Sequence, residues 1–323
     1  MTAFQVLVHG PVMKLVLDGI SKTLPMHKLW EQADPDAFIK DNGHKIQALV
    51  GGFKGKIDDA LMAQLPNLKI ISNFGVGYDM VDAAAAAKRG IVVTNTPDVL
   101  NEEVADTALG LLLMTVRTLP QSERYLRAGR WETEGNFPLS ASLRGRTMGI
   151  VGLGRIGKAI ARRGEAFGLK IAYYGRNRQS DVAFPYYSDL VAMARDVDIL
   201  MVILPGGPST KHLINRPVLE ALGPDGVLIN VARGTVVDEQ ALIEILEEKR
   251  ILGAGLDVFE FEPKVPQRLT NCDNAVLLPH VGSASHHTRN LMGQLVVDNV
   301  LAIAAGKAPL TPVAETPWPL ARG

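Results

Sequence analysis

The sequence has only one cysteine, Cys272, among 323 residues. This excludes a disulfide within the chain and a cysteine-rich zinc site, and both exclusions suit a reducing compartment. The chain also has a formal net charge of zero, because 34 basic residues balance 34 acidic ones. Such a balance gives no indication of a nucleic acid or an acidic membrane surface as partner.

Long hydrophobic runs are also absent. The longest apolar block, around residues 108–114, is too short to cross a bilayer. The N-terminus has no basic region before its short apolar stretch, so it predicts a first strand and not a secretion signal. With 47% apolar and 21% charged residues, the composition is typical of a globular protein. We therefore expect a cytoplasmic protein that is long enough for two domains.

Residues 147–157, TMGIVGLGRIG, form the most informative stretch. A short apolar run is followed by Gly152, Gly154 and Gly157, and then by a helical pattern from Lys158 to Phe167. In a strand-turn-helix unit, these glycines permit a tight turn, close approach to a pyrophosphate, and close packing of helix on strand. The context predicts a dinucleotide site, although the glycine spacing alone is also found in structural turns.

The segment after the second strand indicates which dinucleotide is bound. In an NAD site this strand ends near an acid that accepts hydrogen bonds from the ribose. Here the strand at 170–174 is followed by Arg176, Asn177 and Arg178, and the first acid is Asp181. A guanidinium can bind a 2′-phosphate that a carboxylate would repel. The sequence therefore favours NADP, the alternative being that both arginines are ordinary surface charges.

The chain divides into two α/β units in which short apolar runs alternate with helical segments. The first unit has predicted strands at 6–8, 27–30, 48–50, 70–74 and 91–94. The second has six, at 148–151, 170–174, 198–203, 226–231, 253–258 and 275–278, as a complete dinucleotide-binding sheet requires. A last helix begins near Ser285 and leads to a proline-rich tail at 309–319, which we expect to be extended, docked or frayed.

Three ends of predicted strands in the second unit carry polar side chains. Arg233 follows the strand at 226–231, Glu260 and Glu262 follow the strand at 253–258, and His280 follows the last strand. Ligands bind beyond the carboxyl ends of strands in such sheets. We therefore expect the arginine, one carboxylate and the histidine to converge.

Taken together, these motifs resemble the D-2-hydroxyacid dehydrogenases over nearly the whole chain. The matching stretches are 73–79, 152–157, 230–234, 256–263, and 279–283 with Arg289. The resemblance implies a flavodoxin-like substrate domain (1–98 plus 288–323) and a Rossmann cofactor domain (99–287), both doubly wound parallel sheets, with a cleft between them. It also implies a homodimer. The segment with Trp131 and Phe137 is predicted to be irregular, and it either belongs to the core or reaches across the dimer interface to the partner.

The resemblance also assigns roles to the residues at the strand ends. His280 would be the general acid, and Glu262 would pair with it and stabilise its protonated form, with Glu260 as the competing candidate. Arg233 would bind the substrate carboxylate or polarise its carbonyl. The substrate-binding set is Gly52, Val76, Gly77 and Arg233, and the catalytic set is Arg233, Glu262 and His280. The expected cofactor-binding residues are Thr107, Gly152, Gly154, Arg155, Ile156, Gly157, Arg176, Asn177, Arg178, Val231, Ala232, Asp257, His280 and Gly282, and no metal is expected.

Within the family, the chain most resembles the NADPH-preferring glyoxylate and hydroxypyruvate reductases. Reduction of another 2-oxo acid, such as 2-ketogluconate or phenylpyruvate, is the first alternative, because side chains around Gly52, Phe53 and Trp131 set specificity. A formate dehydrogenase is disfavoured because that family has Gln where Glu262 stands. A nucleotide-sensing corepressor, like the C-terminal binding proteins, is disfavoured because those proteins carry long tails and an acid after the second strand.

Overall fold

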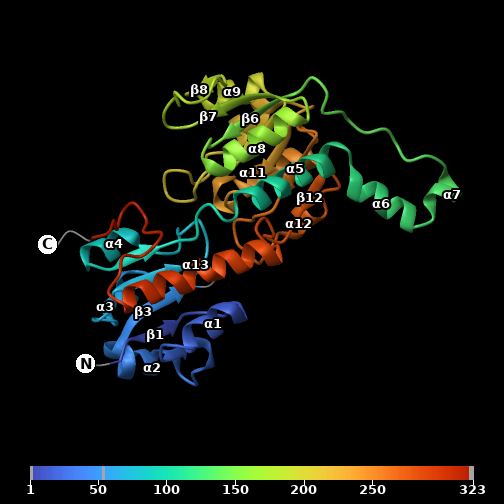
Figure 1. The fold of residues 1–323 in the computed structure, drawn as a ribbon. Coiled ribbons are helices and arrows are strands. Elements are labelled where there is room, and N and C mark those ends of the chain that lie inside the picture. The colour runs from blue at the N-terminus through green and yellow to red at the C-terminus, as the bar shows by residue number, and fades with distance from the viewer. Residues whose placement is uncertain (1–2, 53–54, 320–323) are drawn as a thin grey trace. The chain divides into compact units, whose positions relative to one another are not determined.

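The computed structural model describes residues 3–52 and 55–319 (Figure 1). Its contacts divide the chain into two compact units. Unit 1 comprises Met1–Leu100 and Ser285–Gly323, and unit 2 comprises Asn101–Ala284. The sequence predicted domain borders after residues 98 and 287, whereas these contacts change unit after Leu100 and Ala284.

Unit 1 is built on a five-stranded parallel sheet with the order β2-β1-β3-β4-β5. Its strands are runs of buried aliphatic residues, as expected for parallel strands covered on both faces. The order is that of a flavodoxin-like sheet. The bounds are β1 Gln5–Val8, β2 Met26–Lys28, β3 Ile46–Gly51, β4 Ile70–Asn73 and β5 Val92–Thr94.

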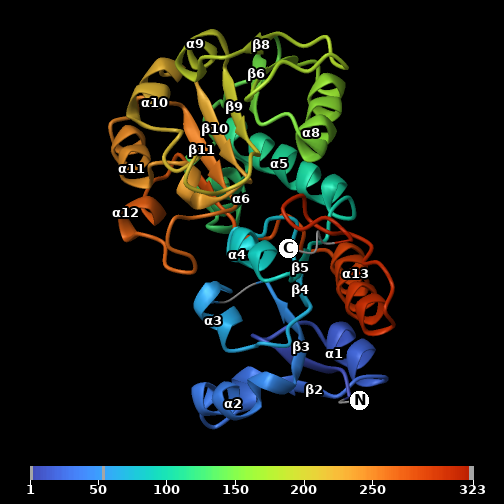
Figure 2. The same cartoon turned by 90° about the vertical axis from the view of Figure 1, so that its left-hand side faces the viewer.

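Helices cover both faces of this sheet (Figure 2). Helices α1 and α13 pack on each other and α13 packs on β4, while α2, α3 and α4 contribute to the core cluster of the opposite face. The bounds are α1 Lys14–Ser21, η1 Leu29–Glu31, α2 Pro35–Asn42, η2 Gly43–Lys45, α3 Asp59–Ala63, α4 Ala83–Lys88 and α13 His286–Ala304.

Unit 2 is built on a seven-stranded parallel sheet with the order β12-β11-β10-β9-β6-β7-β8. The chain starts at β6, adds strands on one side and then crosses to the other side with β9. The point where the order reverses is where such sheets bind ligands. The bounds are β6 Thr147–Val151, β7 Lys170–Tyr174, β8 Tyr186–Tyr187, β9 Ile199–Val202, β10 Val227–Asn230, β11 Gly253–Leu256 and β12 Ala275–Leu277.

The sheet of unit 2 also lies between two helical layers. Figure 2 shows α10 and α11 on one side of β9 to β11 and α5 and α8 on the other. Residues of α9, α10 and α11 pack with the strands in one buried aliphatic cluster. The bounds are α5 Asn101–Val116, α6 Leu119–Arg127, α7 Arg130–Glu134, α8 Arg155–Ala166, α9 Leu190–Asp196, α10 Arg216–Leu222, η3 Gly234–Val236, α11 Glu239–Glu247 and α12 Gln267–Thr270.

Short polar side chains fix where many of the helices begin. An Asp, Asn or Ser precedes the first turn and accepts a hydrogen bond from a backbone N–H group that would otherwise lack a partner. These N-caps are Asp34, Asp58, Asp82, Asp189, Asn215, Asp238 and Ser285. The cap at Ser285 confirms the predicted start of the last helix.

The predicted α/β fold class, with two parallel sheets, is confirmed. Two details differ from the predictions. The segment predicted to be irregular contains α6 and α7, so Trp131 lies in a helix. A seventh strand, β8, extends the second sheet. Of the three alternatives expected for the proline-rich tail, the structure shows the docked one, because Thr316 and Thr311 form hydrogen bonds with Val93 and Asn95 at β5. Within the described ranges, no helix is both long enough and apolar enough to cross a membrane.

Candidate active site

The glycine turn lies between β6 and α8 and has the geometry of a phosphate cradle. Gly152 has a φ of 102°, which favours glycine, and a Cβ on Gly157 would lie 2.4 Å from the Gly152 carbonyl oxygen. Gly154 has open space where a Cβ would stand. Helix α8 starts directly after it with Arg155 and Ile156, and the N–H groups of a helix's first turn are the groups that bind anions in such units. The turn therefore fits a dinucleotide pyrophosphate.

The segment after β7 lies next to this turn. The Gln179 side chain donates a hydrogen bond of 2.7 Å to the carbonyl oxygen of Leu153. Arg176, Asn177 and Arg178 precede Gln179 and are exposed. Within residues 3–52 and 55–319, neither arginine forms an ion pair, so both guanidinium groups are available beside the turn.

The first acid after β7 has a cationic partner. The Asp181 carboxylate lies 2.6 Å from the Lys158 ammonium of α8. The hydrogen bond from Lys158 lowers the pKa of Asp181 below its usual value. Asp181 is therefore engaged by a lysine and does not occupy the place of a ribose-binding acid directly after the strand.

Asp257 anchors the turn that carries His280. One Asp257 carboxylate oxygen accepts the N–H of Val281 at 2.7 Å and the other accepts the N–H of Gly282 at 2.8 Å. The His280 N–H donates to the Asp257 carbonyl oxygen at 2.8 Å, which helps hold His280 at a φ of 54°. Burial raises the pKa of Asp257, against the opposing effect of the two N–H groups. Thr107 of α5 reaches the same turn through the Gly282 carbonyl oxygen.

Glu262 is the carboxylate that pairs with His280. Its Oε2 lies 2.8 Å from Nδ1 of His280, and its Oε1 accepts the N–H of Phe259 at 2.9 Å. Burial raises the pKa of Glu262, but these hydrogen bonds and the charges of His280 and Arg233 outweigh it and leave the pKa lowered. A carboxylate on Nδ1 leaves Nε2 of the half-exposed imidazole to face a reactant.

Glu260, the competing candidate, has a different partner. Its carboxylate lies 2.9 Å from Nε2 of His212, in the loop after β9. The Glu260 N–H donates to the buried Glu239 side chain at 3.1 Å. The sequence did not predict that His212 and Glu239 hold Glu260 in place, because neither residue lies in a recognisable motif. Geometry thus separates two carboxylates that stand only two residues apart.

Arg233 follows β10 and is held by its own strand end. The Asn230 side chain donates to the Arg233 carbonyl oxygen at 3.1 Å and accepts the N–H of Ala232 at 3.0 Å. Val231 and Ala232 are buried. A Cβ on Gly206 would lie 2.8 Å from the Arg233 Cγ, so the loop after β9 leaves room for the arginine. The charge of Arg233 helps lower the pKa of Glu262, which places both groups in one electrostatic environment.

The remaining predicted substrate-binding residues belong to unit 1. The Asn73 side chain donates to the carbonyl oxygens of Gly75 and Gly77, at 3.1 and 3.0 Å. Gly52 has a φ of 148°, and a Cβ there would lie 2.6 Å from the Phe74 carbonyl oxygen. The loop with Val76 therefore lies next to Gly52, whereas Phe53 lies outside the described residues.

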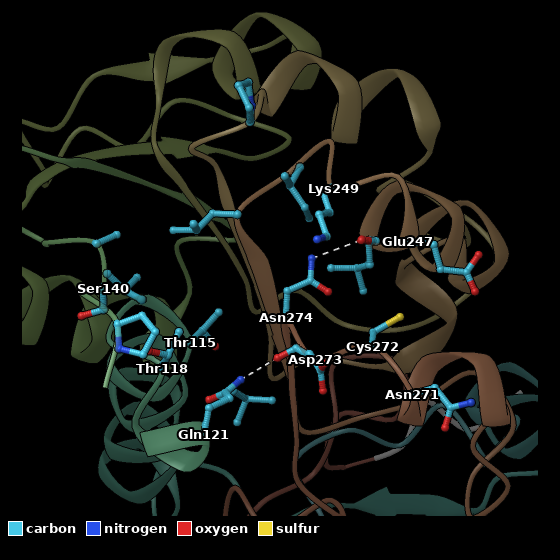
Figure 3. Close-up of a pocket in the computed structure, with 18 of the residues that line it drawn as sticks. Thr115, Thr118, Gln121, Ser140, Glu247, Lys249, Asn271, Cys272, Asp273 and Asn274 are labelled. Carbon is cyan, nitrogen blue, oxygen red and sulfur yellow. Dashed lines mark hydrogen bonds between the residues drawn. The ribbon is translucent and has the colours of Figure 1, made fainter. Parts of the chain in front are cut away.

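A cavity of about 740 Å³ opens elsewhere in unit 2 (Figure 3). Its wall includes Thr115, Lys249, Asn274 and residues 137–141. Lys249 and Asn274 precede β11 and β12, so the cavity lies at the amino ends of these strands. The glycine turn, Arg233 and His280 lie at the carboxyl ends, so this cavity is not the candidate active site. No group of three metal-ligating side chains occurs in the part of the chain that the structure describes.

Comparisons with known proteins agree with this geometry. The family model for the D-isomer specific 2-hydroxyacid dehydrogenase, NAD binding domain, matches residues 109–282. Glyoxylate/hydroxypyruvate reductase A from Arabidopsis thaliana is 45% identical, over 97% of this chain and 100% of the relative. The 2-ketogluconate reductase of Gluconobacter oxydans is 38% identical, over 95% and 98%.

A similar solved structure is the NADPH-dependent glyoxylate/hydroxypyruvate reductase of Sinorhizobium meliloti in complex with NADP and malonate. It is 53% identical, with a TM-score of 0.93 and coverage of 99% of both chains. The sequence motifs, the paired parallel sheets and these matches together show that the chain belongs to the D-isomer specific 2-hydroxyacid dehydrogenase family.

Proposed function

We propose that this protein reduces small 2-oxo acids with NADPH, glyoxylate to glycolate and hydroxypyruvate to D-glycerate. The observation that carries the proposal is the 2.8 Å hydrogen bond between His280 and Glu262, at the same sheet edge as the glycine turn. An imidazole held by a carboxylate is suited to donate a proton to a carbonyl oxygen. The names of the relatives from Arabidopsis and Sinorhizobium support the choice of substrates.

The reaction requires one hydride and one proton for each carbonyl group. NADPH, when bound, supplies the hydride to the carbonyl carbon. His280 donates the proton from Nε2 to the carbonyl oxygen, while Nδ1 keeps its hydrogen bond to Glu262. Arg233 binds the substrate carboxylate or polarises the carbonyl through its planar guanidinium group. The N–H groups of Val76 and Gly77 would bind the substrate carboxylate.

Direct rate measurements test this proposal. Initial rates of NADPH and NADH oxidation are compared side by side, with glyoxylate and then hydroxypyruvate as acceptor. We expect turnover of both acids and a clear preference for NADPH. Turnover of 2-ketogluconate or phenylpyruvate alone would contradict the substrate assignment, and peptide binding with no turnover of any 2-oxo acid would favour the corepressor-like alternative.

We predict that Arg176→Gln removes most of the NADPH preference. A guanidinium that binds the 2′-phosphate through charge-assisted hydrogen bonds contributes about tenfold or more in affinity. The KM for NADPH should therefore rise about tenfold, while the KM for NADH stays within about twofold. Arg195→Gln, which changes an exposed arginine of α9, is the matched control. Equal changes for both cofactors would contradict a 2′-phosphate contact.

We also propose that the protein is a cytoplasmic homodimer. The single cysteine suits a reducing compartment. Helices α6 and α7 stand away from the sheet of unit 2 (Figure 1) and present Leu126 and Trp131, which are 56% and 60% exposed. Leu139, in the segment that lines the cavity, is fully exposed. Large exposed apolar side chains in one segment of the chain support an interface there.

We predict that Leu126→Glu shifts the protein from dimer to monomer. A carboxylate buried in an apolar interface without a partner is strongly unfavourable. Light scattering after size-exclusion chromatography should show the mass of one chain instead of two. Phe167→Glu, at a 47% exposed phenylalanine that ends α8, is the matched control and should leave the mass unchanged. A dimer mass for Leu126→Glu would contradict an interface at α6.

A further inference from the structure

We propose that Asn95 is a positioning residue for substrate binding, and that the C-terminal segment holds Asn95 in place through Thr311. This inference rests on the proposed function, in which the N–H groups of Val76 and Gly77 bind the substrate carboxylate. It gives a physical reason why these two N–H groups keep a fixed direction. All the contacts that carry it lie within unit 1.

The two N–H groups belong to two successive peptide units. A trans peptide is planar, and its C=O and N–H groups point in opposite directions. The carbonyl of Gly75 therefore determines the direction of the Val76 N–H, and the carbonyl of Val76 determines that of the Gly77 N–H. Among the described residues, neither N–H has a hydrogen-bond partner, and both residues are partly exposed.

The two carbonyl groups are held to different extents. The Gly75 oxygen accepts two hydrogen bonds, from the Thr96 N–H at 3.0 Å and from the Asn73 side chain at 3.1 Å. The Val76 oxygen accepts one, from the Asn95 side-chain amide at 2.8 Å. Since glycine follows Val76, the peptide between Val76 and Gly77 can rotate at low steric cost. Asn95 is thus the one described group that fixes the direction of the Gly77 N–H.

The C-terminal segment holds Asn95 from behind. The Thr311 hydroxyl donates to the Asn95 carbonyl oxygen at 2.6 Å, and the Asn95 N–H donates to the Thr311 carbonyl oxygen at 3.3 Å. Asn299 of α13 fixes Thr311 in turn, because its side chain donates to the Thr311 hydroxyl at 3.0 Å and accepts the Thr311 N–H at 3.2 Å. A continuous set of hydrogen bonds therefore runs from α13 through the tail to the substrate loop.

Steady-state kinetics of Asn95→Ala and Thr311→Val test this proposal. With Asn95→Ala, we expect the KM for glyoxylate and the inhibition constant of oxamate, a 2-oxo acid analogue, to rise about tenfold. The kcat should change less than about threefold, because the proton donor and the cofactor site remain intact. Thr311→Val should raise the same two constants about threefold, and Thr311→Ser, which keeps the hydroxyl, should restore wild-type values.

Asn67→Ala is the matched control, because the Asn67 side chain also donates to a backbone carbonyl of unit 1, that of His44, at 2.6 Å. It should leave all constants unchanged, and the dissociation constant for NADPH should be the same in every variant. If the wild-type enzyme is active but neither Asn95→Ala nor Thr311→Val changes the KM for glyoxylate or the inhibition constant of oxamate, the positioning role of Asn95 is overturned. If Asn95→Ala does not fold, the KM for glyoxylate and the inhibition constant of oxamate in Thr311→Val and Thr311→Ser decide whether Asn95 has this positioning role. A wild-type protein without turnover of any 2-oxo acid would overturn the proposed function and this inference with it.

Discussion

Replacement of His280 by glutamine should lower kcat for glyoxylate reduction by about 10²- to 10⁴-fold, the usual contribution of general acid catalysis. Glutamine keeps a polar side chain of similar reach but cannot donate a proton as an imidazolium does. The turn around position 280 should survive, because it is held by backbone N–H groups bound to Asp257. Cofactor binding should therefore persist, and fluorescence titration with NADPH measures it beside the rate.

His44→Gln serves as the control for this prediction, because His44 is exposed in a short 3₁₀ helix of unit 1. Its kcat should equal that of the wild-type enzyme. Near-normal turnover in His280→Gln would contradict the assignment of the general acid. If His280→Gln loses both NADPH binding and turnover, the turn around position 280 has collapsed. That result would contradict the anchoring of this turn by Asp257.

The pH profile gives a second readout of the same pair. The hydrogen bonds from His280 and Phe259 keep the pKa of Glu262 below its usual value. The carboxylate therefore stays ionised as the pH falls through the normal titration range of glutamate, and the pair is lost only at lower pH. In Glu262→Gln, no carboxylate is left to titrate at this position. The acid limb of kcat/KM that comes from protonation of Glu262 should therefore lie below the usual range of glutamate in the wild-type enzyme and be missing in the variant.

The fold was largely predictable because its signals are local. Runs such as Ile199–Val202 and Val227–Asn230 are apolar throughout, as buried parallel strands require, and Asp, Asn or Ser residues mark the helix starts. Strand β8 was missed because it has two residues and only extends an edge. Helix α6 was missed because its composition is mostly polar and it lies apart from the core. The docked tail depends on backbone groups at β5 and on the Asn299 side chain of α13, which no local pattern reveals.

Candidate site residues could be predicted where they belong to a recognisable sequence motif. They could be predicted less well where their role depends on contacts in the folded chain. Motif order selected Arg233 and His280 as candidates, and the sequence already favoured Glu262 over Glu260. The structure adds that Glu262 is hydrogen-bonded to His280, whereas Glu260 is hydrogen-bonded to His212. The supporting asparagines were missed, although a signal exists. Asn73, Asn95 and Asn230 each stand at the carboxyl end of a strand or directly after one, where an amide can bind the backbone of the adjoining loop. Their importance lies in long-range geometry, which the sequence does not contain.

Gly234→Ala should be the most disruptive small substitution near the site. A Cβ at this position would lie 1.8 Å from the Phe259 carbonyl carbon and 2.3 Å from the Glu260 nitrogen. Both atoms are backbone, so the loop with Arg233 and the loop with Glu262 must move apart. Overpacking of this kind costs about 3 kcal/mol or more of unfolding free energy. A shift of about 1 Å in catalytic groups costs about 10²-fold in rate, so kcat/KM should fall by at least that factor.

Gly110→Ala is the matched control, because a Cβ there meets nothing within 4 Å and Gly110 lies inside α5. Alanine in a helix interior is favoured over glycine by about 0.5–1 kcal/mol. Denaturant unfolding should therefore show a lower midpoint for Gly234→Ala and an equal or higher one for Gly110→Ala. Wild-type stability and turnover in Gly234→Ala would mean that the Phe259–Glu260 backbone can move away without a loss of unfolding free energy. The close approach of the two loops would then have no role in setting the distance between Arg233 and the His280–Glu262 pair.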